Sequence, residues 1–137
     1  MGFQNINLDL MTALPSQTFE SLKNTLNTAV SLPVKHISAY SLIIEDGTPI
    51  EKEYSKGLLD IPNEDTDREM YMYTVEFLSK NGFKQYEISN FAKDGYECRH
   101  NVKYWTDEEY IGLGTAAHSY IGNCRFYNTS DINEYIG

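Results

Sequence analysis

Cysteine is scarce in this chain, since only Cys98 and Cys124 occur among its 137 residues. Two thiols at unrelated positions exclude a disulfide framework, which favours a reducing compartment. No apolar run approaches the roughly 20 residues that a helix needs to cross a bilayer. No signal peptide precedes the first predicted strand. We therefore expect a cytoplasmic protein without an integral membrane segment.

Basic residues are also few: 11 Lys and Arg stand against 20 Asp and Glu, which gives a net charge of −9. Nucleic-acid binding depends on Lys and Arg that neutralise phosphates, so no nucleic-acid partner is expected. The same charge argues against attraction to an anionic membrane surface. Apolar residues make up 41% of the chain, however. That content is enough for a core, and we expect residues 1–137 to form a single domain fragment.

Residue periodicity predicts an alternation of strands and helices. Strands are predicted at 6–10, 36–44 and 83–89, and helices at 18–31 and 65–80. Residues 50–63 have weak periodicity and are interpreted as loop and short helix. The resulting βαβαβ order predicts an α/β fold with a mainly parallel sheet.

The last third of the chain has weaker signals. We predict a long polar loop at 90–109, a short strand at 110–114, and a hairpin whose turn is Gly122-Asn123. Asp131 and Glu134 have the spacing of a capping box and open a short helix. Both ends of the sequence look cut, so we expect an internal piece of a larger protein.

Several ordered motifs lie between Tyr86 and Ser119. They read YEISNFAK from Tyr86, ECRHN from Glu97, YW at Tyr104-Trp105, and GLGTAAHS from Gly112. Together they resemble the radical S-adenosylmethionine (SAM) proteins of the oxygen-independent coproporphyrinogen III oxidase family, most closely its haem-chaperone-like branch. The resemblance covers nearly the whole chain. It implies that the βαβαβ units are the later part of an incomplete (β/α) barrel, followed by a β-hairpin extension.

The resemblance implies a SAM site at Asp9, Ile43 and His118. Asp9 falls on the family's Asp before Leu-Pro-x-Gln-Thr, Ile43 on a position whose backbone lies near SAM, and His118 on a position beside it. From the residues alone, Asp9 either accepts hydrogen bonds from a ribose or amino group, or is a capping or solvent-facing acid. Ile43 alone reads as a buried strand residue, and His118 as a satisfied interior histidine.

The loop after the first strand departs from the family pattern. The family usually has an aromatic residue and Gly where this chain has Thr12 and Ala13, and its chaperone-like branch usually has Gly in place of Ser16. Glycine permits a positive φ and close backbone approach. The loop is therefore the part of the predicted SAM site where the resemblance says least about the backbone path.

The segment from His100 to Trp105 matches the branch's His-Asn-x-x-Tyr-Trp signature, which implies that His100 contacts haem. Imidazole is a common haem ligand. Arg99 and Lys103 can pair with propionates, and Tyr104 or Trp105 can stack on the macrocycle. The alternative is a structured loop in which His100 bonds the backbone and Trp105 fills the core.

Two further interpretations concern a possible metal pair at His100 and the role of His36. Cys98 and His100 would form a Cys-x-His metal pair, but zinc needs four ligands and the other candidates are distant. His36, at the start of a predicted strand, is interpreted as structural.

Three functions stay open at this point. The first is a haem chaperone, which the signature favours; the second is an oxidase that decarboxylates coproporphyrinogen propionates; the third is an inert structural piece. The resemblance implies SAM and a [4Fe–4S] cluster in the parent protein, with porphyrin or haem as the partner and haem as the one cofactor open to this chain. Exposed sheet edges favour self-association.

The cysteine count generates the first testable prediction. A [4Fe–4S] cluster anchored by three thiolates cannot be built from Cys98 and Cys124. Anaerobic incubation with iron and sulfide, followed by desalting and iron quantitation, should leave no stoichiometric cluster on this chain. A cluster that survives desalting would contradict the prediction.

Overall fold

A computed structural model describes residues 2–137. The chain divides into two compact units, the first ending at Glu97 and the second spanning Cys98–Gly137. In chain order the elements are β1 (Asn7–Thr12), α1 (Phe19–Ser31), β2 (His36–Ser41), α2 (Pro49–Ser55), α3 (Glu64–Lys80), β3 (Lys84–Gln85), β4 (Asn90–Ala92), α4 (Arg99–Trp105), β5 (His118–Ile121), β6 (Cys124–Tyr127) and α5 (Ile132–Ile136).

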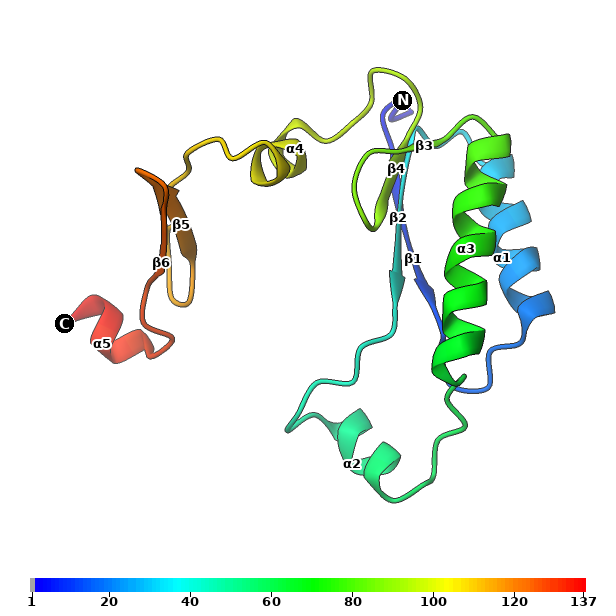
Figure 1. The fold of residues 1–137 in the computed structure, drawn as a ribbon, viewed down its shortest axis with the longest axis horizontal. Helices are drawn as coiled ribbons and strands as arrows, with labels where there is room; N and C mark the ends of the chain where they lie inside the picture. The colour runs from blue at the N-terminus through cyan, green and yellow to red at the C-terminus, as the bar shows by residue number, and fades with distance from the viewer. Residues whose placement is uncertain (1) are drawn as a thin grey trace. The chain divides into compact units, whose positions relative to one another are not determined.

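The first unit is a four-stranded sheet in the order β1-β2-β4-β3. Helices α1 and α3 lie side by side on one face of it (Figure 1). Between helices and sheet lies a core of ten buried apolar residues: Leu22, Leu26, Ala29, Val34, Ile37, Ala39, Met70, Leu78, Phe83 and Phe91. The α/β fold class is confirmed. No helix within residues 2–137 has the length and apolar character needed to span a membrane.

Capping residues define where the two long predicted helices begin. Thr18 accepts a hydrogen bond from the backbone N–H of Ser21 and caps α1, and Asn63 caps α3 through Thr66. The first turn of α3 is acidic, which the helix dipole favours. Asn81 ends α3, and Gly82 follows it at φ 81°. Both predicted long helices are therefore confirmed.

The prediction of a mainly parallel sheet is wrong. Within residues 2–137, β1 and β2 are the only neighbouring strands that pair in parallel; β4 runs antiparallel to both β2 and β3. The predicted strand at 83–89 is reduced to the two residues of β3, and the chain turns back so that β4 inserts beside β2. The cause is Phe91, whose fully buried ring lies in the core opposite Ile37. β3 keeps the direction of β1 and β2, but β4 separates it from them.

β2 is shorter than predicted, since it ends at Ser41 and leaves Ile43 beyond the strand. The predicted loop at 90–109 is also wrong, because it contains β4 and the seven-residue helix α4. β1 lies at one edge of the sheet, so an exposed edge is present. Self-association through that edge stays a prediction.

The second unit is built around the predicted hairpin, which is confirmed. Gly122 and Asn123 connect β5 and β6 with φ of 57° and 64°, as a type I′ turn requires. The predicted strand at 110–114 is wrong: it is a single antiparallel bridge from Tyr110 to Tyr120. Asp131 caps α5 as predicted. Ser119 is the one buried residue of this unit, which therefore has no apolar core of its own.

The loop after β1 adopts glycine-like backbone angles at residues that are not glycine. Ala13 and Ser16 have φ of 55° and 59°. The backbone N–H of Ser16 donates to the carbonyl of Asp60 at 2.6 Å, and that of Gln17 to Leu14 at 2.9 Å. The positive φ angles that glycine would favour at these two positions are therefore kept at a cost in backbone strain.

This strain generates a stability prediction. Ser16 is exposed, so Ser16→Gly removes little packing while relieving the left-handed conformation. We expect a gain of about 0.5–1 kcal/mol in the free energy of unfolding, measured by urea denaturation. The matched control is Ser21→Gly inside α1, which should lose about 0.5 kcal/mol. Loss of stability in Ser16→Gly would mean that the Ser16 side chain makes a compensating contact.

Candidate functional site

The strand β1 carries two faces with different chemistry. Leu8 and Leu10 pack against the core, whereas Asn7 and Asp9 alternate with them on the opposite, helix-free face. The parallel register sets Asn7 beside His36 on β2. Asp9 is exposed on this face, so of its two sequence interpretations the capping role is wrong, while the ligand-accepting and solvent-facing roles remain.

The other two predicted SAM positions have unexpected environments. Ile43 is 72% exposed, so its interpretation as a buried strand residue is wrong. His118 is also exposed, on β5, where its ring lies 5.5 Å from that of its cross-strand partner Tyr127. Its interpretation as an interior histidine is wrong as well. Asp9 and Ile43 belong to the first unit and His118 to the second, and their grouping into one site stays a prediction.

The run of small residues before His118 has a structural role. A Cβ atom added at Gly112 would collide with the backbone carbonyl of His118. The backbone N–H of Gly112 also donates to the Oγ of the buried Ser119 at 3.0 Å. Gly112 therefore allows the chain to approach its own backbone closely, which holds β5 and His118 in place.

His36 is the one buried histidine among residues 2–137, at 7% exposure. Its Nδ1 lies 2.6 Å from Oδ1 of Asn7, and its Nε2 lies 2.7 Å from the hydroxyl of Tyr86. Asn7 in turn donates from Nδ2 to Oδ1 of Asp9 at 2.6 Å. We call Asp9, Asn7, His36 and Tyr86 the β1–β2 polar chain. The structural interpretation of His36 is confirmed by its burial, and its link to Asp9 is new.

Sequence reasoning did not identify Asn7 or Tyr86. Asn7 shares the strand phase of Asp9, which was a usable signal for a common face. Tyr86 lies fifty positions from His36 in the chain, and no local pattern connects the two. Burial lowers the pKa of His36, while the nearby carboxylates of Asp9 and Glu87 act in the opposite direction.

The second predicted site lies on α4. His100 and Tyr104 are one helical turn apart, and the Tyr104 hydroxyl lies 3.0 Å from His100 Nε2. The Tyr104 ring meets the ring of Tyr110 edge-on, with centroids 4.6 Å apart. His100 and Tyr104 are both exposed. His100 therefore bonds a side chain, and the alternative in which it bonds the backbone is not what the structure has.

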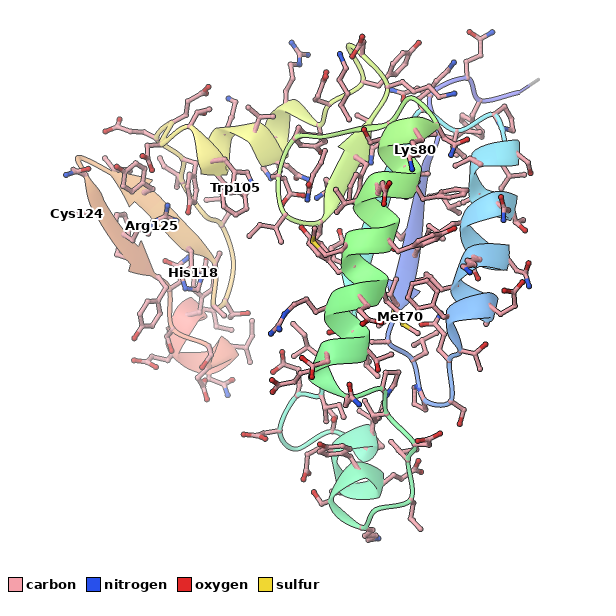
Figure 2. All side chains as sticks on the ribbon, turned by 45° about the vertical axis from the view of Figure 1, so that its right-hand side comes forward. Met70, Lys80, Trp105, His118, Cys124 and Arg125 are labelled. Atoms are coloured by element: carbon pink, nitrogen blue, oxygen red, sulfur yellow. The ribbon has the colours of Figure 1, made fainter. Side chains whose placement is uncertain are left out.

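The remaining members of the signature are also at the surface. Trp105 is 55% exposed and projects from α4 rather than into a core (Figure 2), so its interpretation as a core residue is wrong. Arg99 is exposed at the first position of the helix. Lys103 pairs with Glu108 at 3.6 Å, which competes with its predicted role toward propionates.

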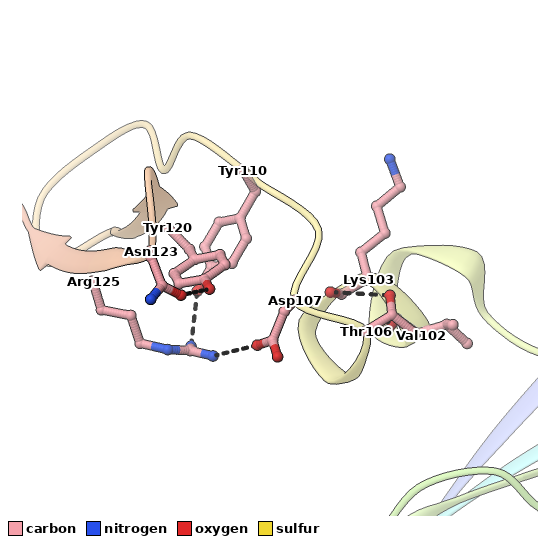
Figure 3. A network of polar contacts seen from close by, with 8 residues as sticks. All are labelled: Val102, Lys103, Thr106, Asp107, Tyr110, Tyr120, Asn123 and Arg125. Atoms are coloured by element: carbon pink, nitrogen blue, oxygen red, sulfur yellow. Dashed lines mark hydrogen bonds and ion pairs between the residues drawn. The ribbon is translucent and has the colours of Figure 1, made fainter.

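A polar network supports the aromatic residues of this unit (Figure 3). Arg125 donates to the Tyr110 hydroxyl at 3.2 Å and lies 3.9 Å from the carboxylate of Asp107. Its guanidinium also lies over the Tyr120 ring, 5.1 Å from the centroid. The Tyr120 hydroxyl donates to Asn123 at 2.8 Å. Arg125 therefore connects the hairpin to the segment that follows α4 and holds Tyr110 against Tyr104.

The described residues do not fit an iron–sulfur cluster. No group of three or more His, Cys, Asp or Glu within residues 2–137 is arranged to hold a metal ion. Cys98 and Cys124 form no disulfide. The Cys98–His100 metal pair thus gains no third ligand, and the chain offers no three-thiolate set.

No family model matches the chain. Among curated proteins it is similar to the haem chaperone HemW of Bacillus subtilis, with 46% identity over 136 residues, covering 99% of this chain and 36% of that protein. The haem chaperone HemW of Lactococcus lactis is 42% identical and is likewise covered over 36% of its length. The predicted resemblance is confirmed: this chain is related to the haem chaperone HemW proteins along nearly its whole length. It spans about a third of the length of these relatives.

Two further comparisons extend this relationship. The mitochondrial radical S-adenosyl methionine domain-containing protein 1 of Danio rerio is 36% identical over 113 residues, covering 82% of this chain and 26% of that protein. The structure of coproporphyrinogen III oxidase HemN from Escherichia coli, a radical SAM enzyme, matches with a TM-score of 0.67 at 22% identity. That match covers 93% of this chain and 32% of HemN. The fold is therefore that of a segment of a radical SAM protein.

The burial of His36 generates a pH prediction. The unfolded histidine takes up a proton near its ordinary pKa of 6.5, whereas the folded one, with a lowered pKa, resists it. Stability should therefore fall as pH drops below that value. Between about pH 7.5 and about pH 5.5, urea unfolding of the wild type should lose more stability than that of His36→Asn. Equal losses would show that His36 titrates alike in both states.

Proposed function

We propose that this chain is part of a haem chaperone-type protein and that haem binds at α4 with His100 as the iron ligand. The observation that carries the proposal is the exposed pair of His100 and Tyr104 on one face of α4, supported by Tyr110. These side chains contribute to no core, yet they are held by defined contacts. The names of the HemW relatives support the same ligand.

The chemistry around α4 suits a flat, apolar ring with two carboxylates. Tyr104 and Trp105 offer aromatic surface that is already at the protein surface. Arg99 is the cation best placed for a propionate, because Lys103 is engaged by Glu108. The arrangement therefore supplies a nitrogen ligand, ring contacts and a cation from seven consecutive residues.

Iron coordination requires a free lone pair on His100. Its Nε2 is engaged by Tyr104, so the iron either binds Nδ1 or displaces the tyrosine hydroxyl from Nε2. Because both side chains are exposed, displacement costs no more than about 0.5–1.5 kcal/mol, the net value of one hydrogen bond. That cost is small beside a metal–ligand bond, so the contact orients the imidazole without blocking it.

We also propose that Asp9, the backbone at Ile43, and His118 contact SAM. Asp9 is exposed on the helix-free face of the sheet, where its carboxylate can accept hydrogen bonds from a ribose. SAM supplies a radical only when an iron–sulfur cluster reduces it, and residues 2–137 hold no ligand set for one. No radical step is therefore assigned to this chain, and its own residues bind and orient.

The oxidase alternative rests on a likeness to HemN at 22% identity, which carries the fold alone. No contact in the described residues favours it over haem binding. The inert-fragment alternative is decided by the same experiment that tests the proposal.

Hemin titration followed by absorbance should give a Soret shift with the wild-type chain. His100→Ala should weaken hemin binding by on the order of tenfold or more. Replacing even a residue that only hydrogen-bonds a metal ligand typically lowers metal affinity by that factor. His118→Ala is the matched control, since it removes another exposed histidine of the same unit and should leave the titration unchanged.

The other possible results of the hemin titration have different meanings. Equal weakening in both variants would indicate nonspecific coordination by surface imidazoles. An unchanged titration in His100→Ala would remove His100 from the site, and the absence of any shift in the wild type would favour the inert fragment.

A further inference from the structure

The β1–β2 polar chain ends at an unused carboxylate oxygen. Asp9 Oδ1 accepts the hydrogen bond from Asn7, whereas among residues 2–137 no hydrogen bond reaches its second oxygen, Oδ2. Asp9 and Asn7 are exposed, His36 is buried, and Tyr86, on the far side of His36, is half-buried. The polar chain therefore links the buried ring of His36 to one open acceptor at the surface.

The Asp9 end of the polar chain determines which atom carries the proton in each of its hydrogen bonds. An ionised carboxylate only accepts hydrogen bonds, so Asn7 must turn its NH₂ group to Asp9 and its carbonyl oxygen to His36. That oxygen accepts from His36, so Nδ1 carries the proton. In the neutral ring Nε2 then has a lone pair, which accepts from the Tyr86 hydroxyl. One arrangement of protons satisfies all three contacts.

The backbone makes this arrangement rigid. Asn7 and His36 are opposite each other in the parallel ladder of β1 and β2, so their backbones cannot move apart without breaking the sheet. The Oγ of Ser38, buried on the same face, adds a longer contact to Asn7 Oδ1 at 3.4 Å. The buried ring of His36 also meets the Tyr86 ring edge-on, with centroids 5.6 Å apart.

We propose that Asn7, His36 and Tyr86 are positioning residues that hold the Asp9 carboxylate in one orientation, with Oδ2 presented to a ligand bearing hydroxyl or amino donors, such as a ribose. The ligand class rests on the SAM contact proposed above, whereas the positioning does not. An exposed Asp on a strand would otherwise sample several rotamers, and fixing it before binding avoids that ordering cost. Loss of the polar chain should therefore weaken a ribose-bearing ligand by about two- to tenfold.

The first measurement needs no ligand. In the wild-type chain, ¹⁵N chemical shifts should show His36 as the Nδ1–H tautomer, and three-bond couplings should show a single Asp9 χ1 rotamer. His36→Leu should average those couplings, while His36→Asn, which retains a donor near the Nδ1 position, should preserve them. An Nε2–H tautomer in the wild type would overturn the proposal whether or not the variants fold.

Two tyrosine variants provide a matched pair. Tyr86→Phe removes the hydroxyl that holds Nε2, whereas Tyr71→Phe removes a hydroxyl that bonds Gln85 and the carbonyl of Ile88, away from the polar chain. Partial averaging of the Asp9 couplings in Tyr86→Phe and none in Tyr71→Phe is expected. A folded His36→Leu or Tyr86→Phe protein with unchanged Asp9 couplings would overturn the positioning role.

Saturation-transfer NMR with SAM as the probe then separates positioning from function. If wild-type protein binds SAM and His36→Leu binds it about two- to tenfold more weakly, with rescue in His36→Asn, both proposals are supported. If the wild type binds no SAM while Asp9 has a single rotamer, the SAM contact fails and the positioning stands. Equal SAM binding by wild type and His36→Leu would overturn the inference while leaving the SAM contact intact.

Discussion

The parallel register of β1 and β2 is the constraint on which the first unit depends. It pairs Asn7 with His36, Leu8 with Ile37 and so on to the ends of both strands. Because side chains alternate along a strand, a slip of one residue would exchange the two faces. Leu8 would leave the core and Asn7 would enter it without partners. The apolar core and the polar chain to Asp9 therefore both depend on the same register. Each of them would be lost if β1 shifted by one residue against β2.

The second unit is ordered by a different balance of forces. With Ser119 as its one buried residue, it gains little from apolar burial. Its contacts are hydrogen bonds, ring contacts and the ion pairs of Arg125 with Asp107 and of Lys103 with Glu108. Exposed ion pairs and hydrogen bonds each contribute little to stability. This weakness leaves Tyr104 and Trp105 at the surface, where a ring-shaped ligand would itself supply the missing apolar contact.

The sequence predicted elements whose signals are local. Thr18, Asn81-Gly82, Gly122-Asn123 and Asp131 mark caps and turns, and all four stand in the structure as expected. The failures have a common cause. β4 is defined by pairing with β2, which lies more than fifty residues earlier in the chain, and α4 has neither a buried stripe nor a side-chain cap at Cys98. Such elements form because of tertiary packing, which periodicity within a short window does not contain.

The residues of the candidate sites show the same difference between local signals and tertiary packing. Asp9 and His100 were found by motif, but Asn7 and Tyr86 come to Asp9 only through strand register and a distant loop. The loop after Asp9 adds a second sign of constraint, since Ala13 and Ser16 hold positive φ angles that favour glycine. Strain of this kind persists only where surrounding contacts impose it, here the short bond from Ser16 to Asp60. An acid fixed from behind by a polar chain, followed at once by a loop fixed against its own backbone preference, is the arrangement expected where a ligand must meet a preformed surface.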